Sequence, residues 1–247
     1  MNNYENFYQL HQQKTPLLLA NAWNAKSAQL IEKNGYKAIA TSSAAIANSL
    51  GYEDGEKISF GELFYVLQRI ISCINIPLSV DMETGYSNNI SEVISNIEKL
   101  IEAGVVGINL EDSQGTALFL KKLNGIKNHL AKNNMQLFIN ARTDSFLLNL
   151  PSPLEETLKR LKPYEDAGAD GIFVPFIKDT DVIKKITAST TLPVNVLCMP
   201  SLTSIESLAE CGVRRISMGN FLFKAHYNHL DTLIKNINTH QSFSPLF

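Results

Sequence analysis

The sequence predicts an α/β fold of the (β/α)₈ or TIM-barrel type, with residues 1–247 forming a single domain. Three observations predict it. Four segments repeat one pattern, in which a helical stretch ends at a glycine and a short apolar run follows. Short apolar runs, typical of parallel strands buried on both faces, recur eight times along the chain. The length of 247 residues is that of a one-domain barrel.

The repeated segments are EKNGYKAIATSS, EAGVVGINLEDS, DAGADGIFVPF and ECGVRRISMGN, with glycines at Gly35, Gly104, Gly168 and Gly212. A glycine at this point suits the left-handed residue that ends a helix. Four further apolar runs, PLLLANAW, IPLSVDME, QLFINART and LPVNVLCMP, complete the set. We expect strands near 17–21, 37–41, 78–81, 106–110, 137–140, 171–174, 194–197 and 214–218, and a last helix near 220–238.

Helical patterns such as ISEVISNIEKLIEA fill the gaps between these runs. Regular alternation of strand and helix implies right-handed crossovers and a parallel sheet. Eight such units close into a barrel more readily than they form an open sheet. A doubly wound open sheet is the alternative.

Composition and charge exclude several classes of protein. The formal net charge of -2, without a basic run, offers no surface for nucleic acid. The N-terminus lacks the apolar core of a signal peptide, and no apolar stretch is long enough to span a membrane. Cys73, Cys198 and Cys211 have no CxxC spacing, which argues against a disulfide framework or a structural zinc site. We expect a soluble cytoplasmic protein.

Acidic residues gather where the second, third and fourth strands are expected to end. In a barrel of this type the active site lies at these carboxyl ends. Asp81 and Glu83 are two residues apart, so along an extended strand end both point to one side, and Glu111 comes from the neighbouring strand. Converging carboxylates without His or Cys suit Mg²⁺ or Mn²⁺ rather than zinc. Alternatively, these acids, and Asp112 above all, cap the helices that follow.

Arg142 follows the fifth strand and places a cation among these carboxylates. It can stabilise negative charge that develops on a substrate, or brace the rim through a salt bridge to Glu111 or Asp144. A guanidinium group can do both at once.

Substrate contacts are expected from two other strand ends. The turn TSSAA brings Ser42, Ser43 and Ala44, whose small side chains and backbone N–H groups can cradle a carboxylate. Asn195 lies on the seventh strand and is a further candidate. Tyr52, Tyr86 and Cys198 are candidates for a general base, but their spacing places none of them.

Together, SVDMETGYSNN, GVVGINLEDS and INARTDSFL resemble motifs of the isocitrate lyase/phosphoenolpyruvate mutase superfamily, and the resemblance covers nearly the whole chain. It implies a Mg²⁺ ion with Asp81 as direct ligand, and with Glu83 and Glu111 acting largely through water. Asp54, in the matching segment TSSAAIANSLGYEDGE, would lie close to metal and substrate, and Arg142 would stabilise an enolate.

The resemblance further implies that Ser42 and Ser43 hold the carboxylate of a 2-oxo acid. It also implies a homo-oligomer, a dimer or tetramer, often with a C-terminal helix exchanged between subunits. One departure from the motifs of the superfamily narrows the range of expected reactions. The Lys–x–Cys–Gly–His loop of isocitrate and methylisocitrate lyases is replaced by EDSQGTALFLKKLNGIKNHL, so the chain resembles a short-loop member.

We therefore expect a Mg²⁺-dependent carbon–carbon lyase of decarboxylase type. Its substrate would be a small 2-oxo acid or an oxaloacetate-like 2-oxo dicarboxylate, cleaved through a stabilised pyruvate enolate. One alternative is a phosphonate-processing enzyme of the phosphoenolpyruvate mutase or phosphonopyruvate hydrolase type, although their longer gating loop is also absent. A barrel that binds 2-oxo acids without turnover is the other.

Overall fold

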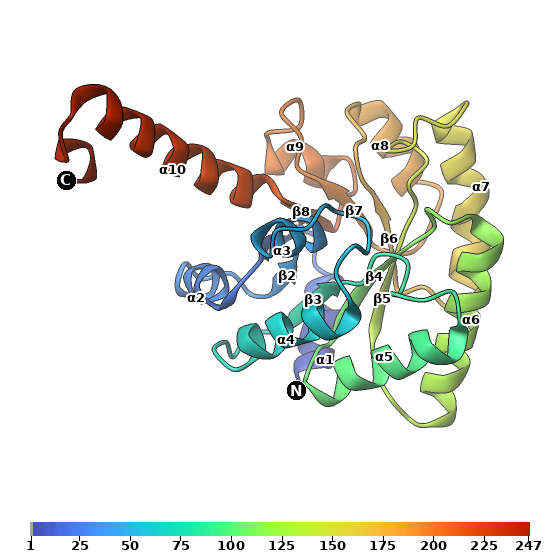
Figure 1. Cartoon of the computed structure of the whole chain (residues 1–247). Coiled ribbons are helices and arrows are strands. Elements are labelled where there is room, and N and C mark those ends of the chain that lie inside the picture. The colour runs from blue at the N-terminus through green and yellow to red at the C-terminus, as the bar shows by residue number, and fades with distance from the viewer. Residues whose placement is uncertain (1) are drawn as a thin grey trace.

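The computed structural model describes residues 2–247, in which eight parallel strands close into a barrel (Figure 1). The strands are β1 (Leu17–Ala22), β2 (Ile39–Thr41), β3 (Leu78–Asp81), β4 (Gly107–Glu111), β5 (Phe138–Arg142), β6 (Gly171–Val174), β7 (Val194–Leu197) and β8 (Arg215–Ser217). Parallel pairing of β1 with β8, in which Leu17 lies opposite Arg215, closes the ring. The predicted barrel is confirmed, and the open-sheet alternative is wrong.

Most helices lie around the outside of the ring of strands, whereas the last long helix, α10, extends away from it (Figure 1). The helices are α1 (Asn3–Leu10), α2 (Ala25–Lys33), α3 (Ser43–Ser49), α4 (Phe60–Ile71), α5 (Ile90–Glu102), α6 (Thr116–Lys132), α7 (Pro153–Asp166), α8 (Thr180–Thr187), α9 (Ile205–Glu210) and α10 (Phe221–His240), followed by the short η1 (Ser244–Leu246). None of the helices in residues 2–247 is long and apolar enough to cross a membrane.

The four glycines of the repeat end α2, α5, α7 and α9. Their φ angles are 82° at Gly35, 100° at Gly104, 91° at Gly168 and 84° at Gly212. These values lie in the left-handed region that glycine adopts without a steric penalty. The repeat therefore marks the points where the chain leaves a helix and turns into the next strand, as predicted.

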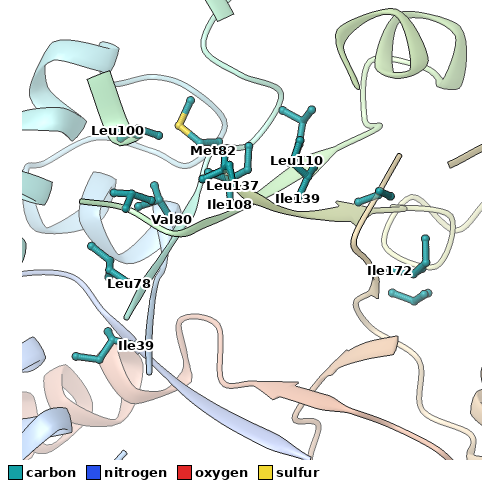
Figure 2. Packing of buried hydrophobic residues seen from close by; sticks show 14 of the residues in the cluster. Ile39, Leu78, Val80, Met82, Leu100, Ile108, Leu110, Leu137, Ile139 and Ile172 are labelled. Atoms are coloured by element: carbon teal, nitrogen blue, oxygen red, sulfur yellow. The ribbon is translucent and has the colours of Figure 1, made fainter. Parts of the chain in front are cut away.

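A large apolar core lies between the strands and the helices. Figure 2 shows part of it, where Val80, Ile108 and Ile139 point outward from neighbouring strands. A smaller cluster fills the amino-terminal end of the barrel interior and includes Leu19 and Phe138. Phe7 of α1 seals this cluster and is fully buried.

Above this cluster the barrel interior is polar. Arg215 is only 1% exposed and donates to Asn109 Oδ1 at 3.1 Å, which also accepts from Asn140 Nδ2 at 2.9 Å. Ser217 Oγ donates to Asn195 Oδ1 at 3.0 Å. Because the amino-terminal end is sealed, these side chains form a floor, and a ligand can approach it only from the carboxyl ends of the strands.

Candidate active site

A pocket of about 160 Å³ opens at the carboxyl ends of the strands. Its polar lining comes from β1, β3, β4, β5 and β8 and from the segments that follow β2 and β8, and includes Asp54, Asp81 and Arg142. Its other side is apolar. A hollow of about 420 Å³ at the amino ends of β1 and β2 is larger, but its described lining holds no carboxylate. The small pocket is the candidate active site because charged groups converge there.

Asp81, the last residue of β3, lines the pocket. Its Oδ2 accepts a hydrogen bond from Ser43 Oγ at 2.9 Å, and its backbone N–H donates to Thr41 Oγ1 at 3.0 Å. Its Oδ1 is buried and has no hydrogen-bond partner among residues 2–247. A buried carboxylate oxygen without a partner is costly, so this atom is placed for a ligand.

Glu83 adopts a different geometry from the one that the sequence predicts. The strand ends at Asp81, and Glu83 has φ 46°, in the left-handed region. The prediction of an extended chain from Asp81 to Glu83 is therefore wrong, because the chain turns at Glu83. Glu83 is buried without lining the pocket, and its Oε1 accepts from Tyr86 Oη at 3.1 Å.

Two side chains from outside β3 hold this turn in place. Glu56 Oε1 accepts from the N–H and the hydroxyl of Thr84, at 2.9 and 2.8 Å, and from the N–H of Tyr86 at 2.9 Å. Lys122 of α6 is buried and donates to the carbonyl of Thr84 at 2.7 Å. These contacts stabilise the left-handed conformations of Glu83 and Tyr86, which would otherwise be strained.

Arg142 bridges two carboxylates. Its Nη1 lies 2.9 Å from Glu111 Oε2, and its Nε and Nη2 bind Asp144 at 2.7 and 3.2 Å. The bidentate contact with Asp144 fixes the plane of the guanidinium group. Arg142 also lines the pocket. The same guanidinium group therefore forms the salt bridges at the rim and faces the pocket.

The carboxylates outnumber the cations at this end of the barrel. Burial, together with the nearby charges of Asp81 and Asp54, raises the pKa of Glu83 to about 8. Burial also raises the pKa of Glu111 to about 7, against the opposing effect of Arg142. The pKa of Asp54 is raised by burial and then by Asp81. A divalent cation placed among these groups would favour their ionised forms.

The remaining predicted substrate contacts divide into two groups. Ser42, Ser43 and Ala44 line the pocket at the start of α3, where Ser42 Oγ caps the helix by accepting from the N–H of Ala45 at 3.3 Å. Asn195 does not line the pocket, because it points into the barrel interior, where it is fully buried as part of the floor.

Asp112 has a structural role that its position in the sequence does not reveal. It does not cap α6, whose N-cap is Gly115 without a side-chain hydrogen bond. Its carboxylate instead accepts from the N–H of Asp144 at 2.9 Å, from Arg160 Nη1 at 2.6 Å and from Tyr164 Oη. It therefore ties β4 to the segment after β5 and to α7.

Sequence reasoning missed the apolar side of the pocket. It is formed by Leu147, Phe173, Pro175, Phe176 and Leu197, which come from β6, β7 and the segments that follow β5 and β6. The alternation of β6 could have identified Phe173, because Gly171 and Phe173 share the inward face. Nothing in the sequence indicates that Phe176 has φ 64°.

The arrangement can accommodate a cation with one direct carboxylate ligand. No three His, Cys, Asp or Glu side chains in the described part of the chain are grouped to hold a metal ion together. Direct binding by Asp81, Glu83 and Glu111 at once is therefore not the geometry found. The loop after β4 is short, since residues 112–115 alone separate Glu111 from α6.

Comparisons with known proteins agree with this geometry. The family model described as phosphoenolpyruvate phosphomutase matches residues 7–238. A Mycobacterium tuberculosis protein is 36% identical over 220 residues, which cover 89% of this chain and 83% of that protein. Oxaloacetate decarboxylase 1 of Pseudomonas fluorescens is 30% identical over 223 residues, covering 85% of this chain and 75% of that enzyme.

Among solved structures, a protein from Burkholderia cenocepacia superposes with a TM-score of 0.89 at 34% identity, covering 94% of this chain and 99% of that one. The family-model match spans nearly all of the barrel, and its relatives are similar over most of their length. The chain therefore belongs to the phosphoenolpyruvate phosphomutase family, within the isocitrate lyase/phosphoenolpyruvate mutase superfamily that its motifs resemble.

Proposed function

We propose that this protein is a Mg²⁺-dependent carbon–carbon lyase that acts on a small 2-oxo acid through an enolate of the pyruvate type. One observation carries the proposal: Asp81 Oδ1 is buried and has no hydrogen-bond partner among residues 2–247, and it lies among carboxylates whose pKa values are raised by burial and by one another. A buried carboxylate of this kind requires a positive charge close by.

The donor set fits magnesium. Asp81 would be the direct ligand, and Glu83 and Glu111 would hold the ion through water. Mg²⁺ usually keeps several of its waters and binds only one or two carboxylates directly, so a site with one carboxylate oxygen that has no protein partner in the described chain suits it. Mn²⁺ has the same oxygen preference and is a practical substitute. When bound, the ion would supply positive charge beside the oxygen on which negative charge develops.

The protein's own groups account for the rest of the chemistry. Ala44, in the first turn of α3, offers a backbone N–H that has no partner within its helix and can bind the substrate carboxylate. Arg142 is held in one orientation and can stabilise charge that appears in the transition state without moving. Asp54 lines the pocket beside Asp81 and can hold the proton that the enolate carbon receives.

The activity of one relative supports this choice. The similar Pseudomonas fluorescens protein is an oxaloacetate decarboxylase. When the carboxylate on C3 of such a 2-oxo dicarboxylate leaves as CO₂, its bonding electrons form the enolate directly, so the step needs charge stabilisation but no base to begin. Residues 112–115 leave little room for a catalytic thiol after β4, and no cysteine lies there. We propose the decarboxylase type over the isocitrate lyase type for this reason.

Titration of Mn²⁺ into the protein by calorimetry tests the metal site. We expect Asp81→Asn to weaken binding at least about tenfold, because the variant keeps the shape of the side chain and removes its charge. Asp170→Asn is the matched control. Asp170 is also a largely buried carboxylate, but it lies before β6 at the opposite end of the barrel, paired with Lys127 at 2.6 Å. Equal affinities in wild type and Asp81→Asn would contradict the assignment.

A substrate panel then tests turnover. Pyruvate release is measured with Mg²⁺ from oxaloacetate, methylisocitrate and phosphonopyruvate, with EDTA-treated protein as control. Metal-dependent release from oxaloacetate alone is the expected result. Release from phosphonopyruvate would favour a phosphonate-processing enzyme. Metal-dependent binding of all three without turnover would instead favour a 2-oxo acid-binding barrel.

We also propose that the protein assembles as a dimer or tetramer by exchanging α10. None of the described side chains of α10 is buried, and the helix extends away from the barrel (Figure 1). It exposes Tyr227, Leu230 and Ile234, at 42%, 41% and 55%. Light scattering after gel filtration should show an oligomer that Leu230→Glu weakens and the control Lys235→Gln does not. A monomeric wild type would contradict the proposal.

A further inference from the structure

Asn109 of β4 lines the pocket together with Asp81 of β3. The two residues lie opposite each other in the parallel pairing of these strands, so their side chains are neighbours in the pocket. On the other side of Asp81, the hydroxyl of Ser43 at the start of α3 donates to Asp81 Oδ2 at 2.9 Å. Asp81 therefore lies between the start of α3 and Asn109.

The side-chain amide of Asn109 is held in one orientation. Its Oδ1 accepts from Arg215 Nη2 at 3.1 Å and from Asn140 Nδ2 at 2.9 Å. A guanidinium group has only donors, so the amide atom turned toward Arg215 has to be the oxygen. Because Oδ1 and Nδ2 diverge from the same carbon, Nδ2 and its N–H groups point away from Arg215 and toward the pocket that Asn109 lines.

Arg215 is fully buried behind Asn109 and does not line the pocket. Its Nη2 also lies 3.4 Å from Ser79 Oγ, whereas its Nε and Nη1 have no partner among the described residues. A buried cation with so few partners costs stability, so folding alone does not account for it. A charged donor at Oδ1 polarises the amide of Asn109, however, and so strengthens its Nδ2 as a donor.

Asn21 of β1 also lines the pocket, but its amide is fully used by the backbone. Its Nδ2 donates to the carbonyl of Thr41 at 2.8 Å, and its Oδ1 accepts from the N–H of Met218 at 2.9 Å. The hydrogen bonds that hold Asn109 use only its oxygen. Asn109 thus differs from Asn21 in having an oriented amide nitrogen for a ligand.

From this geometry we infer that Asn109 is a further substrate-binding residue, whose Nδ2 donates a hydrogen bond to the C2 oxygen of the 2-oxo acid. Arg215 acts through Asn109 as a positioning residue. The inference rests on the proposed function, in which the substrate carboxylate lies at α3 and leaves the adjacent carbonyl for the side of β4. When the carboxylate on C3 leaves as CO₂, its bonding electrons form the C2–C3 double bond and the carbonyl electrons move to the C2 oxygen. A donor already aimed at this oxygen stabilises the new charge.

Two variants remove the donor in different ways. Asn109→Asp keeps an oxygen for Arg215 and Asn140 but adds a charge, whereas Asn109→Leu has a similar size and adds none. Both should lower kcat for Mg²⁺-dependent pyruvate release from oxaloacetate by about 10²–10³-fold. In Asn109→Leu, kcat and kcat/KM should fall alike, because the lost interaction strengthens only in the transition state. Ser79→Ala is the matched control, since it also removes an acceptor of Arg215 Nη2 but lies outside the pocket lining, and it should keep the wild-type kcat.

Arg215→Met tests the positioning role. It should lower kcat by about 10–100-fold without lowering the melting temperature, because it removes a buried charge that has no carboxylate partner among residues 2–247. Wild-type kcat in Asn109→Leu would overturn the inference. A loss confined to Asn109→Asp would also overturn it, because the added charge would then be the cause.

If Asn109→Leu does not fold, Arg215→Met decides, since it adds no charge to the pocket: a stable variant with wild-type kcat would overturn the inference. Failure of the proposed function looks different. In that case the wild type itself neither releases pyruvate from oxaloacetate nor binds oxalate with Mg²⁺. An active wild type with an equally active Asn109→Leu contradicts only the role of Asn109.

Discussion

His11 lies at the sealed end of the barrel, and its burial makes the stability of the fold sensitive to acid. The ring is 2% exposed and stacks on Phe138, with ring centroids 4.2 Å apart. Its Nδ1 lies 2.8 Å from the carbonyl of Phe7, and its Nε2 is buried without a partner among the described residues. Burial, with the nearby charge of Arg215, lowers the pKa of His11 from 6.5 to about 3.

The sign of the effect follows from proton binding in the two states. Between about pH 3 and pH 6.5 the unfolded chain binds a proton at His11 and the folded chain does not, so acid favours unfolding. The stability that comes from keeping His11 neutral in the folded state is fully present above pH 6.5 and is lost as the pH falls toward 3. Each pH unit costs about 1.4 kcal/mol in this window, so the loss at pH 5 is about 2 kcal/mol.

Urea unfolding of the metal-free protein at pH 7.5, 6 and 5 measures this contribution against His11→Phe, which keeps an aromatic ring but cannot titrate. At pH 7.5 the variant should be less stable by about 1 kcal/mol, because it loses the hydrogen bond to Phe7. As the pH is lowered, the difference in free energy of unfolding between wild type and His11→Phe should shrink. At pH 5 it should change sign, since only the wild type loses stability by protonation of residue 11. Groups common to both proteins cancel in the comparison. Parallel profiles would refute the reasoning.

Substitutions at Arg142 test both stability and turnover, and substitutions at two glycines test packing. Arg142→Ala should lower the free energy of unfolding by about 3–5 kcal/mol, because two buried carboxylates lose their partner, and should lower kcat by about 10²–10³-fold. Arg142→Lys should recover more stability than turnover, since lysine keeps the charge without the bidentate contact; full turnover in this variant would count against a role in charge stabilisation. Gly107→Ala should cost about 1–3 kcal/mol by thermal melting, because a Cβ would lie 2.7 Å from the ring of Phe7. A Cβ at Gly61 in α4 would meet Ser59 Oγ at 3.7 Å, an ordinary van der Waals contact, so Gly61→Ala should stabilise the protein by up to about 1 kcal/mol. A comparable loss in both variants would contradict this packing argument.

The fold could be predicted because its signals are local. A glycine that ends a helix and an apolar run that forms a buried strand are both visible within a dozen residues, and Gly104 before β4 is an example. The placement of Asp81 and Arg142 in one pocket followed from the fold alone, because the carboxyl ends of parallel strands meet. The single-domain assignment of residues 1–247 stays a prediction.

Contacts between segments distant in sequence were beyond this reasoning. The left-handed turn at Glu83 depends on Glu56 and Lys122, which lie far from it in the chain. From the sequence, Arg215 is only a charged residue in an expected strand. Its burial in the polar interior of the barrel depends on contacts with other strands, such as its hydrogen bond to Asn109. The inward direction of Asn195 likewise depends on the register of β7.

Binding of oxalate with and without Mg²⁺ is the measurement that tests the central claim most directly. Oxalate resembles the pyruvate enolate in charge and in the spacing of its oxygens. If the pocket holds a divalent cation at Asp81 and stabilises an enolate, calorimetry should show oxalate binding to wild type only when Mg²⁺ is present, and Asp81→Asn should abolish it. Oxalate binding of equal strength in EDTA, or in Asp81→Asn with Mg²⁺, would contradict the account.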